Sequence, residues 1–166
     1  AALNQQADYE TPTTDNAALN NGSKKNSSAN AEFLVGQAAA TKALYNQIDI
    51  VAPTNYSIIL NGESGTGKEV IAKTIHQLSS RKGRPFIAMD CGTLSKELAG
   101  SELFGHIKGA FTGAINDKEG HFELANNGTL FLDEVANLSP EIQASLLRVI
   151  QERKFKRIGG TKEIEV

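Results

Sequence analysis

Residues 57–69 read Ser57-Ile58-Ile59-Leu60-Asn61-Gly62-Glu63-Ser64-Gly65-Thr66-Gly67-Lys68-Glu69, a short apolar run followed at once by a glycine-rich turn. The apolar run predicts a buried strand, and an apolar stripe after the turn predicts a helix that starts near Gly67. A triphosphate needs a concave group of backbone N–H donors, which only a glycine-rich turn can bring close enough. The spacing Gly62-x-x-x-x-Gly67-Lys68, set between a strand and a helix, therefore predicts that residues 62–69 bind phosphate and that Lys68 reaches the β- and γ-phosphates.

Glu69 departs from the general form of this motif, in which a serine or threonine that ligates Mg²⁺ follows the lysine. The metal therefore needs another ligand, and the stretch Thr129-Leu130-Phe131-Leu132-Asp133-Glu134 supplies one. A buried strand that ends in two carboxylates places them at the carboxyl edge of a parallel sheet, where ligands of α/β folds bind. We expect Asp133 to hold Mg²⁺ through water and Glu134 to orient or deprotonate the attacking water. The two motifs together predict a nucleoside triphosphatase.

The rest of the globular part alternates short apolar runs with amphipathic patterns. We predict one helix from about Ala38 to Val51, and another that begins after Ser139, an N-cap residue followed by proline. A further strand is predicted at Pro85–Asp90, and a hairpin is predicted around Gly159-Gly160-Thr161. This alternation indicates an α/β fold built on a parallel sheet.

The first 32 residues differ in composition from the remainder. Residues 1–32 consist mainly of Ala, Asn, Thr, Gln and Ser, and their only large apolar side chains are Leu3, Tyr9 and Leu19. Such a segment buries too little apolar area to offset the entropy lost on ordering. We expect a disordered linker at 1–32, a domain at 33–166, and a longer parent protein of which this chain is a part.

Composition and charge argue against several classes of function. The 17 Lys and Arg and the 19 Asp and Glu give a formal net charge of −2, which does not favour a nucleic-acid clamp or a polybasic membrane surface. Cys91 is the only cysteine, so a disulfide framework is excluded and a reducing compartment fits. No apolar run approaches the roughly 20 residues of a membrane span. We expect a cytoplasmic protein that makes no contact with a membrane.

A small-residue segment, Gly109-Ala110-Phe111-Thr112-Gly113-Ala114, lies between the two nucleotide motifs. On the residues alone, Phe111 stands at a glycine-flanked tip, which could be mobile and anchor a partner protein. The alternative is that Phe111 folds back into the core, and composition does not decide between the two.

These stretches together resemble the bacterial enhancer-binding proteins, the NtrC-type AAA+ activators of sigma-54 RNA polymerase. The resemblance covers essentially all of residues 33–166 and rests on 62–69, 101–106, 109–114, 128–134 and 146–152. It includes Glu69, since the family's own phosphate loop carries a glutamate there. It implies a P-loop AAA+ core of three αβα layers with a parallel sheet, ATP and Mg²⁺ as cofactors, and ATP hydrolysis. It also implies that Gly109–Ala114 contact the sigma-54 RNA polymerase holoenzyme, beside a second surface loop at 157–160.

The resemblance has further consequences for the intact protein. Members assemble as homo-oligomeric rings and contact DNA only through a domain that is not present in this chain. A further core strand between residues 57–60 and the Asp133 strand, the arginines that reach a neighbour's ATP, and a helical lid are expected after Val166. We therefore expect an incomplete core and a fragment that is inactive alone. Asp90 falls where many members carry an asparagine that contacts the catalytic glutamate; because Asp accepts but does not donate, Asp90 is only a candidate switch residue.

Two other interpretations remain open at this point. The chain could be a non-catalytic module that binds nucleotide or sigma-54 without turnover, and segments beyond Val166 would discriminate. It could also belong to a different AAA+ remodeller with another client protein, against which the segment 109–114 argues.

Overall fold

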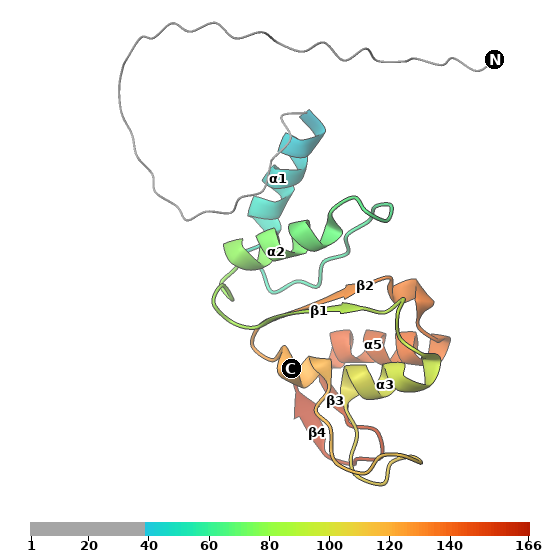
Figure 1. The fold of residues 1–166 in the computed structure, drawn as a ribbon. Helices are drawn as coiled ribbons and strands as arrows, with labels where there is room; N and C mark the ends of the chain where they lie inside the picture. Colours follow the sequence, from blue (N-terminus) through green and yellow to red (C-terminus); the bar gives the residue numbers. More distant parts are fainter. Residues whose placement is uncertain (1–38) are drawn as a thin grey trace, which may run out of the picture. The chain divides into compact units, whose positions relative to one another are not determined.

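The structure is a computed structural model that describes residues 39–166 (Figure 1). The linker expected at 1–32 lies outside the described residues. The elements in chain order are α1 (Ala39–Val51), α2 (Lys68–Leu78), β1 (Phe86–Asp90), α3 (Lys96–Phe104), α4 (His121–Leu124), β2 (Thr129–Asp133), the 3₁₀ turn η1 (Val135–Asn137), α5 (Pro140–Glu152), β3 (Lys154–Lys156) and β4 (Glu163–Glu165). Among these residues, no helix is both long and apolar enough to cross a membrane.

A parallel pair of strands forms the central layer of the fold. β1 pairs with β2 in register, from Phe86 opposite Thr129 to Asp90 opposite Asp133. Helix α2 lies on one side of this pair, and α3 and α5 lie on the other (Figure 1). The predicted α/β core of three αβα layers with a parallel sheet is confirmed.

The main hydrophobic core lies between the sheet and helices α3 and α5. Its buried members come from both layers: Met89, Cys91, Ala99, Leu103, Phe104, Leu138, Leu146, Val149 and Phe155. Leu103 is fully buried, and the rings of Phe104 and Phe122 stack with their centroids 5.7 Å apart. This packing fixes the carboxyl ends of β1 and β2, where the polar residues gather.

Most of the predicted helices and turns form where the sequence indicates. Helix α1 ends at Val51, and Ser139 caps α5 by accepting a hydrogen bond from the Ile142 N–H at 3.4 Å. The hairpin forms as antiparallel β3 and β4, with Phe155 opposite Ile164. Helices α3 and α4 and the turn η1 were not predicted.

The strand expected at Ser57–Leu60 is wrong for this structure. No described strand pairs with these residues, because β1 and β2 pair only with each other. Ile59 is 86% exposed, so the apolar run is not buried as a strand would be. An apolar run becomes a strand only when a neighbour satisfies its backbone groups, and the described residues provide none at this edge.

Candidate active site

The phosphate loop is a tight turn that favours glycine at two positions by its backbone angles and leaves little room for a side chain at a third. Gly65 and Gly67 have φ of +79° and +85°, in the left-handed region that favours glycine. A Cβ on Gly62 would approach the Thr66 hydroxyl oxygen to 2.8 Å. That hydroxyl in turn donates to the carbonyl of Glu63 at 2.8 Å, which closes the loop. The backbone therefore curls as a phosphate nest requires.

Helix α2 presents its N-terminus directly after this turn. Gly67 is the N-cap residue, and among the described residues no side chain caps the helix. The first N–H groups of a helix have no partner within the helix and carry its positive dipole end. The start of α2 is therefore available to an anion held in the turn.

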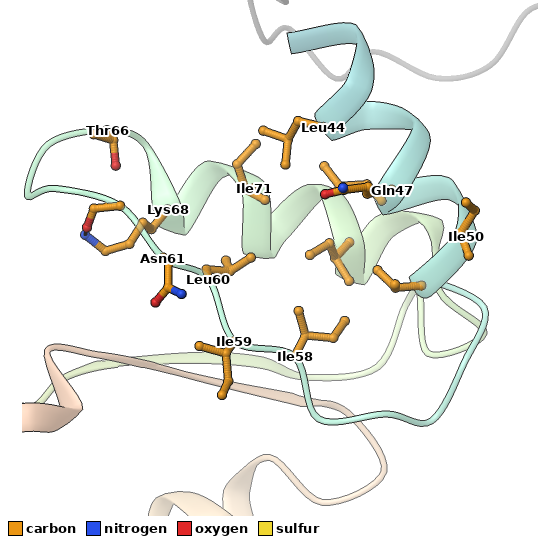
Figure 2. A pocket seen from close by; sticks show the side chains of 14 residues that line it. Leu44, Gln47, Ile50, Ile58, Ile59, Leu60, Asn61, Thr66, Lys68 and Ile71 are labelled. Carbon is orange, nitrogen blue, oxygen red and sulfur yellow. Dashed lines mark hydrogen bonds between the residues drawn. The ribbon is translucent and has the colours of Figure 1, made fainter. Parts of the chain in front are cut away.

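The Lys68 side chain folds back under the turn (Figure 2). Its ammonium donates to the carbonyl oxygens of Gly62 at 3.2 Å and Glu63 at 3.0 Å. It also lies 3.9 Å from Asp133 Oδ1. Lys68 thus brings together the two motifs that the sequence places 65 residues apart.

The acidic pair follows β2 at the carboxyl edge of the sheet, as predicted. Asp133 Oδ1 accepts a hydrogen bond from the Glu134 N–H at 3.0 Å. Glu134 has a φ of +51°, which is uncommon for a residue with a side chain. Its Oε2 accepts a hydrogen bond from Asn137 Nδ2 at 2.8 Å. Both carboxylates remain accessible to solvent and can receive a metal ion or water.

Asp90 and Cys91 lie beside this pair at the end of β1. Asp90 Oδ1 accepts from the Gly92 N–H at 2.8 Å, and the Cys91 N–H donates to the carbonyl of Asp133 at 3.1 Å. Burial raises the pKa of the Cys91 thiol to about 11, and the charges of Asp90 and Asp133 add to the effect. The thiol is therefore neutral near pH 7 and packs as a small apolar group.

Glu69 takes no part in this cluster of carboxylates. Its Oε1 lies 2.7 Å from Lys73 Nζ, one turn further along α2, and both side chains are about half exposed. An ion pair of this kind on a helix surface contributes about 0.3–0.5 kcal/mol.

A cavity of about 670 Å³ adjoins the phosphate loop (Figure 2). Its wall includes Thr66 and Lys68 at the loop, and is otherwise mainly apolar, with Leu44 and Ile48 from α1 and Ile71 from α2. Small-molecule sites are commonly apolar cavities of this size with a few polar groups at one end.

The segment Gly109–Ala114, which is distant from the phosphate loop in the sequence, forms a loop closed by backbone hydrogen bonds. The Gly109 N–H donates to the carbonyl of Ala114 at 2.8 Å, and the Ala114 N–H donates to that of Phe111 at 3.0 Å. Phe111 is 39% exposed and sets its ring edge against His106, with centroids 5.0 Å apart. The ring thus has one supported side and one side open to solvent.

The second surface loop, at 157–160, packs directly against the first. The Ile107 N–H donates to the carbonyl of Ile158 at 3.1 Å. A Cβ on Gly159 would approach the Cβ of Ala110 to 2.8 Å, so only glycine permits this contact. The two loops form one continuous surface.

A family model matches residues 34–166, which is most of the chain. It describes the sigma-54 interaction domain. The chain belongs to the sigma-54 interaction domain family.

Curated relatives of this sigma-54 interaction domain include a regulatory protein and a transcriptional activator. A Nif-specific regulatory protein of Herbaspirillum seropedicae is 54% identical over 133 residues, which are 80% of this chain and 24% of that protein. The DNA-binding transcriptional activator HyfR of Escherichia coli (strain K12) is 51% identical over 133 residues, 80% of this chain and 20% of HyfR. The chain thus spans about a quarter or less of these relatives.

Solved structures of NtrX from Brucella abortus share the fold of the sigma-54 interaction domain. The complexes of NtrX with ADP and with ATP each have a TM-score of 0.72 and 41% identity to this chain. The matches cover 81% of this chain, and 29% and 28% of NtrX, respectively. The expected P-loop core of AAA+ type is confirmed.

Two polar contacts of the sigma-54 interaction domain were missed by sequence reasoning. Asn137 donates to Glu134, and Arg157 makes two hydrogen bonds to Glu123, from Nε at 2.8 Å and from Nη2 at 2.6 Å. The spacing Glu134-x-x-Asn137 indicates the first contact only once a turn is known there. The second joins residues 34 positions apart, and no local pattern signals it.

Proposed function

We propose that this domain binds and hydrolyses ATP and uses the turnover to remodel sigma-54 RNA polymerase through the loop 109–114. The observation that carries the proposal is the 3.9 Å approach of Lys68 Nζ to Asp133 Oδ1 at the carboxyl edge of the sheet. Family membership and the NtrX complexes with ATP and ADP support it. A nucleoside triphosphate is the ligand for which a glycine-rich turn with a lysine, beside two carboxylates, is suited.

Each group of the site has a role that follows from its position. The turn at 62–67 and the first N–H groups of α2 bind the phosphates, and the Lys68 ammonium exchanges its two carbonyl partners for phosphate oxygens. The adjoining apolar cavity can hold a nucleobase. Glu134 orients the attacking water and accepts its proton as the new bond from water to the γ-phosphorus forms and the bond from that phosphorus to the ADP oxygen breaks.

The residues present also suit Mg²⁺. Asp133 offers a partly exposed carboxylate close to Lys68 and therefore close to the bound phosphates. Glu69 is engaged with Lys73 on the surface of α2, so Asp133 is the protein group placed to hold the ion, through water. When bound, Mg²⁺ neutralises the charge that develops on the transferring phosphate.

The two surface loops form the proposed contact with sigma-54. The six residues of the first are Gly109, Ala110, Phe111, Thr112, Gly113 and Ala114, and the half-exposed Phe111 ring supplies an aromatic anchor.

In the intact protein we propose a homo-oligomeric ring in which a neighbouring subunit supplies the arginine for hydrolysis. Residues 1–166 alone should therefore hydrolyse ATP slowly or not at all. DNA contact is assigned to another domain of the intact protein.

In vitro transcription with the full-length protein tests the proposal. We expect transcripts from a sigma-54 promoter with ATP, and none with a non-hydrolysable ATP analogue. Glu134→Gln removes the carboxylate while keeping its size, so ATP should still bind while phosphate release falls about 10²-fold or more. A promoter read by the polymerase with its main sigma factor serves as the control. Transcription that proceeds equally with the analogue would contradict a role for hydrolysis.

A further inference from the structure

The hydrogen bond between Asn137 and Glu134 is held in place by a local turn. The Asn137 N–H donates to the carbonyl of Glu134 at 2.9 Å, and its side-chain Nδ2 donates to Glu134 Oε2 at 2.8 Å. Both groups of Asn137 therefore bind the same residue, one through the backbone and one through the side chain. This double contact accompanies the positive φ of Glu134, which is the N-cap residue of the turn η1.

The backbone of Gly92 lies beside the hydrogen bond between Asn137 and Glu134. A Cβ on Gly92 would collide with Glu134 Oε2 and would lie 3.1 Å from Asn137 Nδ2. The residue that follows the end of β1 by two positions thus leaves no room for a side chain beside either partner of this hydrogen bond. With Oε2 engaged by Asn137, Oε1 is the oxygen left to receive a proton from water.

Asp90 is close to the same place but does not serve Glu134. Its Oδ1 would lie 3.2 Å from the Cβ position on Gly92, and it accepts the Gly92 N–H. An ionised Asp90 has no hydrogen to donate to a second carboxylate. In the described part of the chain, the side-chain donor to Glu134 is Asn137.

We infer that Asn137 is the positioning residue that holds Glu134 in the orientation required for hydrolysis. The inference rests on the proposed function of Glu134. A hydrogen bond from an amide to a carboxylate holds in one rotamer a side chain that would otherwise rotate freely. Misplacement of a catalytic group by about 1 Å reduces the rate by up to about 10²-fold. Asn137 has no role in binding the phosphates, so its substitution should lower the turnover rate and leave the affinity for ATP unchanged.

The test measures kcat and KM for ATP in the full-length protein. Asn137→Ala removes the donor, and we expect kcat to fall about 10-fold while KM stays within about twofold. Asn137→Asp keeps the shape of the side chain and the backbone hydrogen bond, but places a second carboxylate against Glu134. It should lower kcat at least as much, with a melting temperature close to wild type.

A double variant separates positioning from mere structure. Asp90→Asn introduces an amide near Glu134 Oε2, so Asp90→Asn combined with Asn137→Ala should recover at least about threefold in kcat over Asn137→Ala alone. No recovery together with a lowered melting temperature would overturn the inference in favour of a structural role. A kcat of Asn137→Ala that equals or exceeds wild type would also overturn it. Glu134→Gln in the same series reports separately: if it retained wild-type turnover, the proposed function would fail.

Discussion

Lys68 Nζ lies 3.9 Å from Asp133 Oδ1 while it donates to two carbonyl oxygens of its own loop. At that distance the pair attracts electrostatically but is too long for a hydrogen bond. The ammonium is therefore held between the turn and the acidic pair, and the proposed function requires it to reach a β- or γ-phosphate from there. Phosphate binding replaces two neutral acceptors with charged ones, which are stronger partners.

Lys68→Ala should weaken ATP binding by roughly 10- to 100-fold, because a charge-assisted hydrogen bond is worth about 1.5–3 kcal/mol. Titration of the full-length protein with a fluorescent ATP analogue measures the change. Lys73→Ala is the matched control: it removes a lysine from the same helix, whose partner is the surface carboxylate of Glu69, and should alter affinity by less than about twofold. Equal affinities for wild type and Lys68→Ala would exclude Lys68 from the phosphate site.

Cys91 should react slowly with thiol reagents in the folded protein, because only the thiolate reacts and the pKa of Cys91 is about 11. At pH 8 we expect alkylation at least about 100-fold slower than in the chain unfolded in urea, where the thiol is exposed and its pKa is ordinary.

The raised pKa of Cys91 also makes the stability of the folded protein depend on pH. The free energy of unfolding keeps the full contribution of the neutral Cys91 thiol below pH 9. This contribution is lost as the pH rises toward 11, because the thiol of the unfolded chain ionises first. Stability that does not decline between pH 9 and 11 would contradict this, and Cys91→Ala should flatten the decline.

The sequence predicts those elements whose stability is local or whose strands find a partner. Helix α5 forms where Ser139 caps it, and β1 and β2 form because each buries apolar residues beside the other. The run 57–60 has the same apolar character, but a strand also needs a neighbouring strand, and the apolar pattern of one segment does not show whether a partner is present. Helix α3 was missed although Ser95 caps it by accepting a hydrogen bond from the Leu98 N–H at 3.3 Å. Glycine is a poor helix former, and the helix includes Gly100 because Ile142 and Ile158 approach to within 3.1 and 3.2 Å of the position of an added Cβ.

The candidate site was predictable to the extent that its chemistry follows from residue type and strand ends. Lys68, Asp133 and Glu134 are found in one place because parallel strands and the loop after 57–60 share an edge. The partner of Glu134 was not predictable. The resemblance directs attention to Asp90, whereas the amide that bonds to Glu134 comes from Asn137, brought back by a 3₁₀ turn. A cap-like contact of this kind depends on backbone angles that the residue types leave open.

Phe111→Ala should abolish engagement of sigma-54 and leave ATP hydrolysis within about twofold of wild type. The ring is 39% exposed and rests on His106, so its loss removes an exposed aromatic anchor and no contact with the phosphate loop. Capture of sigma-54 by the full-length protein, in parallel with phosphate release, measures both effects. Ile115→Ala is the control, because Ile115 is 75% exposed just outside the loop and should be dispensable. Loss of hydrolysis together with unfolding in Phe111→Ala would favour a core-packing role for the ring.

Gly159→Ala should separate the two surface loops without touching the nucleotide site. Gly159 has a φ of +75°, which strains any residue with a side chain by about 1–2 kcal/mol. The new Cβ would also meet Ala110 at 2.8 Å, and both loops would have to move to relieve the overlap. Such overpacking adds about 1–3 kcal/mol.

Gly83→Ala provides a control that carries the strain alone. Gly83 has a φ of +81°, and no described atom lies within 4 Å of the position of its added Cβ. We expect Gly159→Ala to lower the melting temperature of the full-length protein more than Gly83→Ala, and to reduce capture of sigma-54 while affinity for the ATP analogue is kept. If the two variants had the same melting temperature and captured sigma-54 equally, the contact between Gly159 and Ala110 would not set the position of the loop 109–114. A loss of nucleotide affinity in Gly159→Ala alone would mean that the loop contact also acts on the phosphate site, which would contradict a local effect of Gly159.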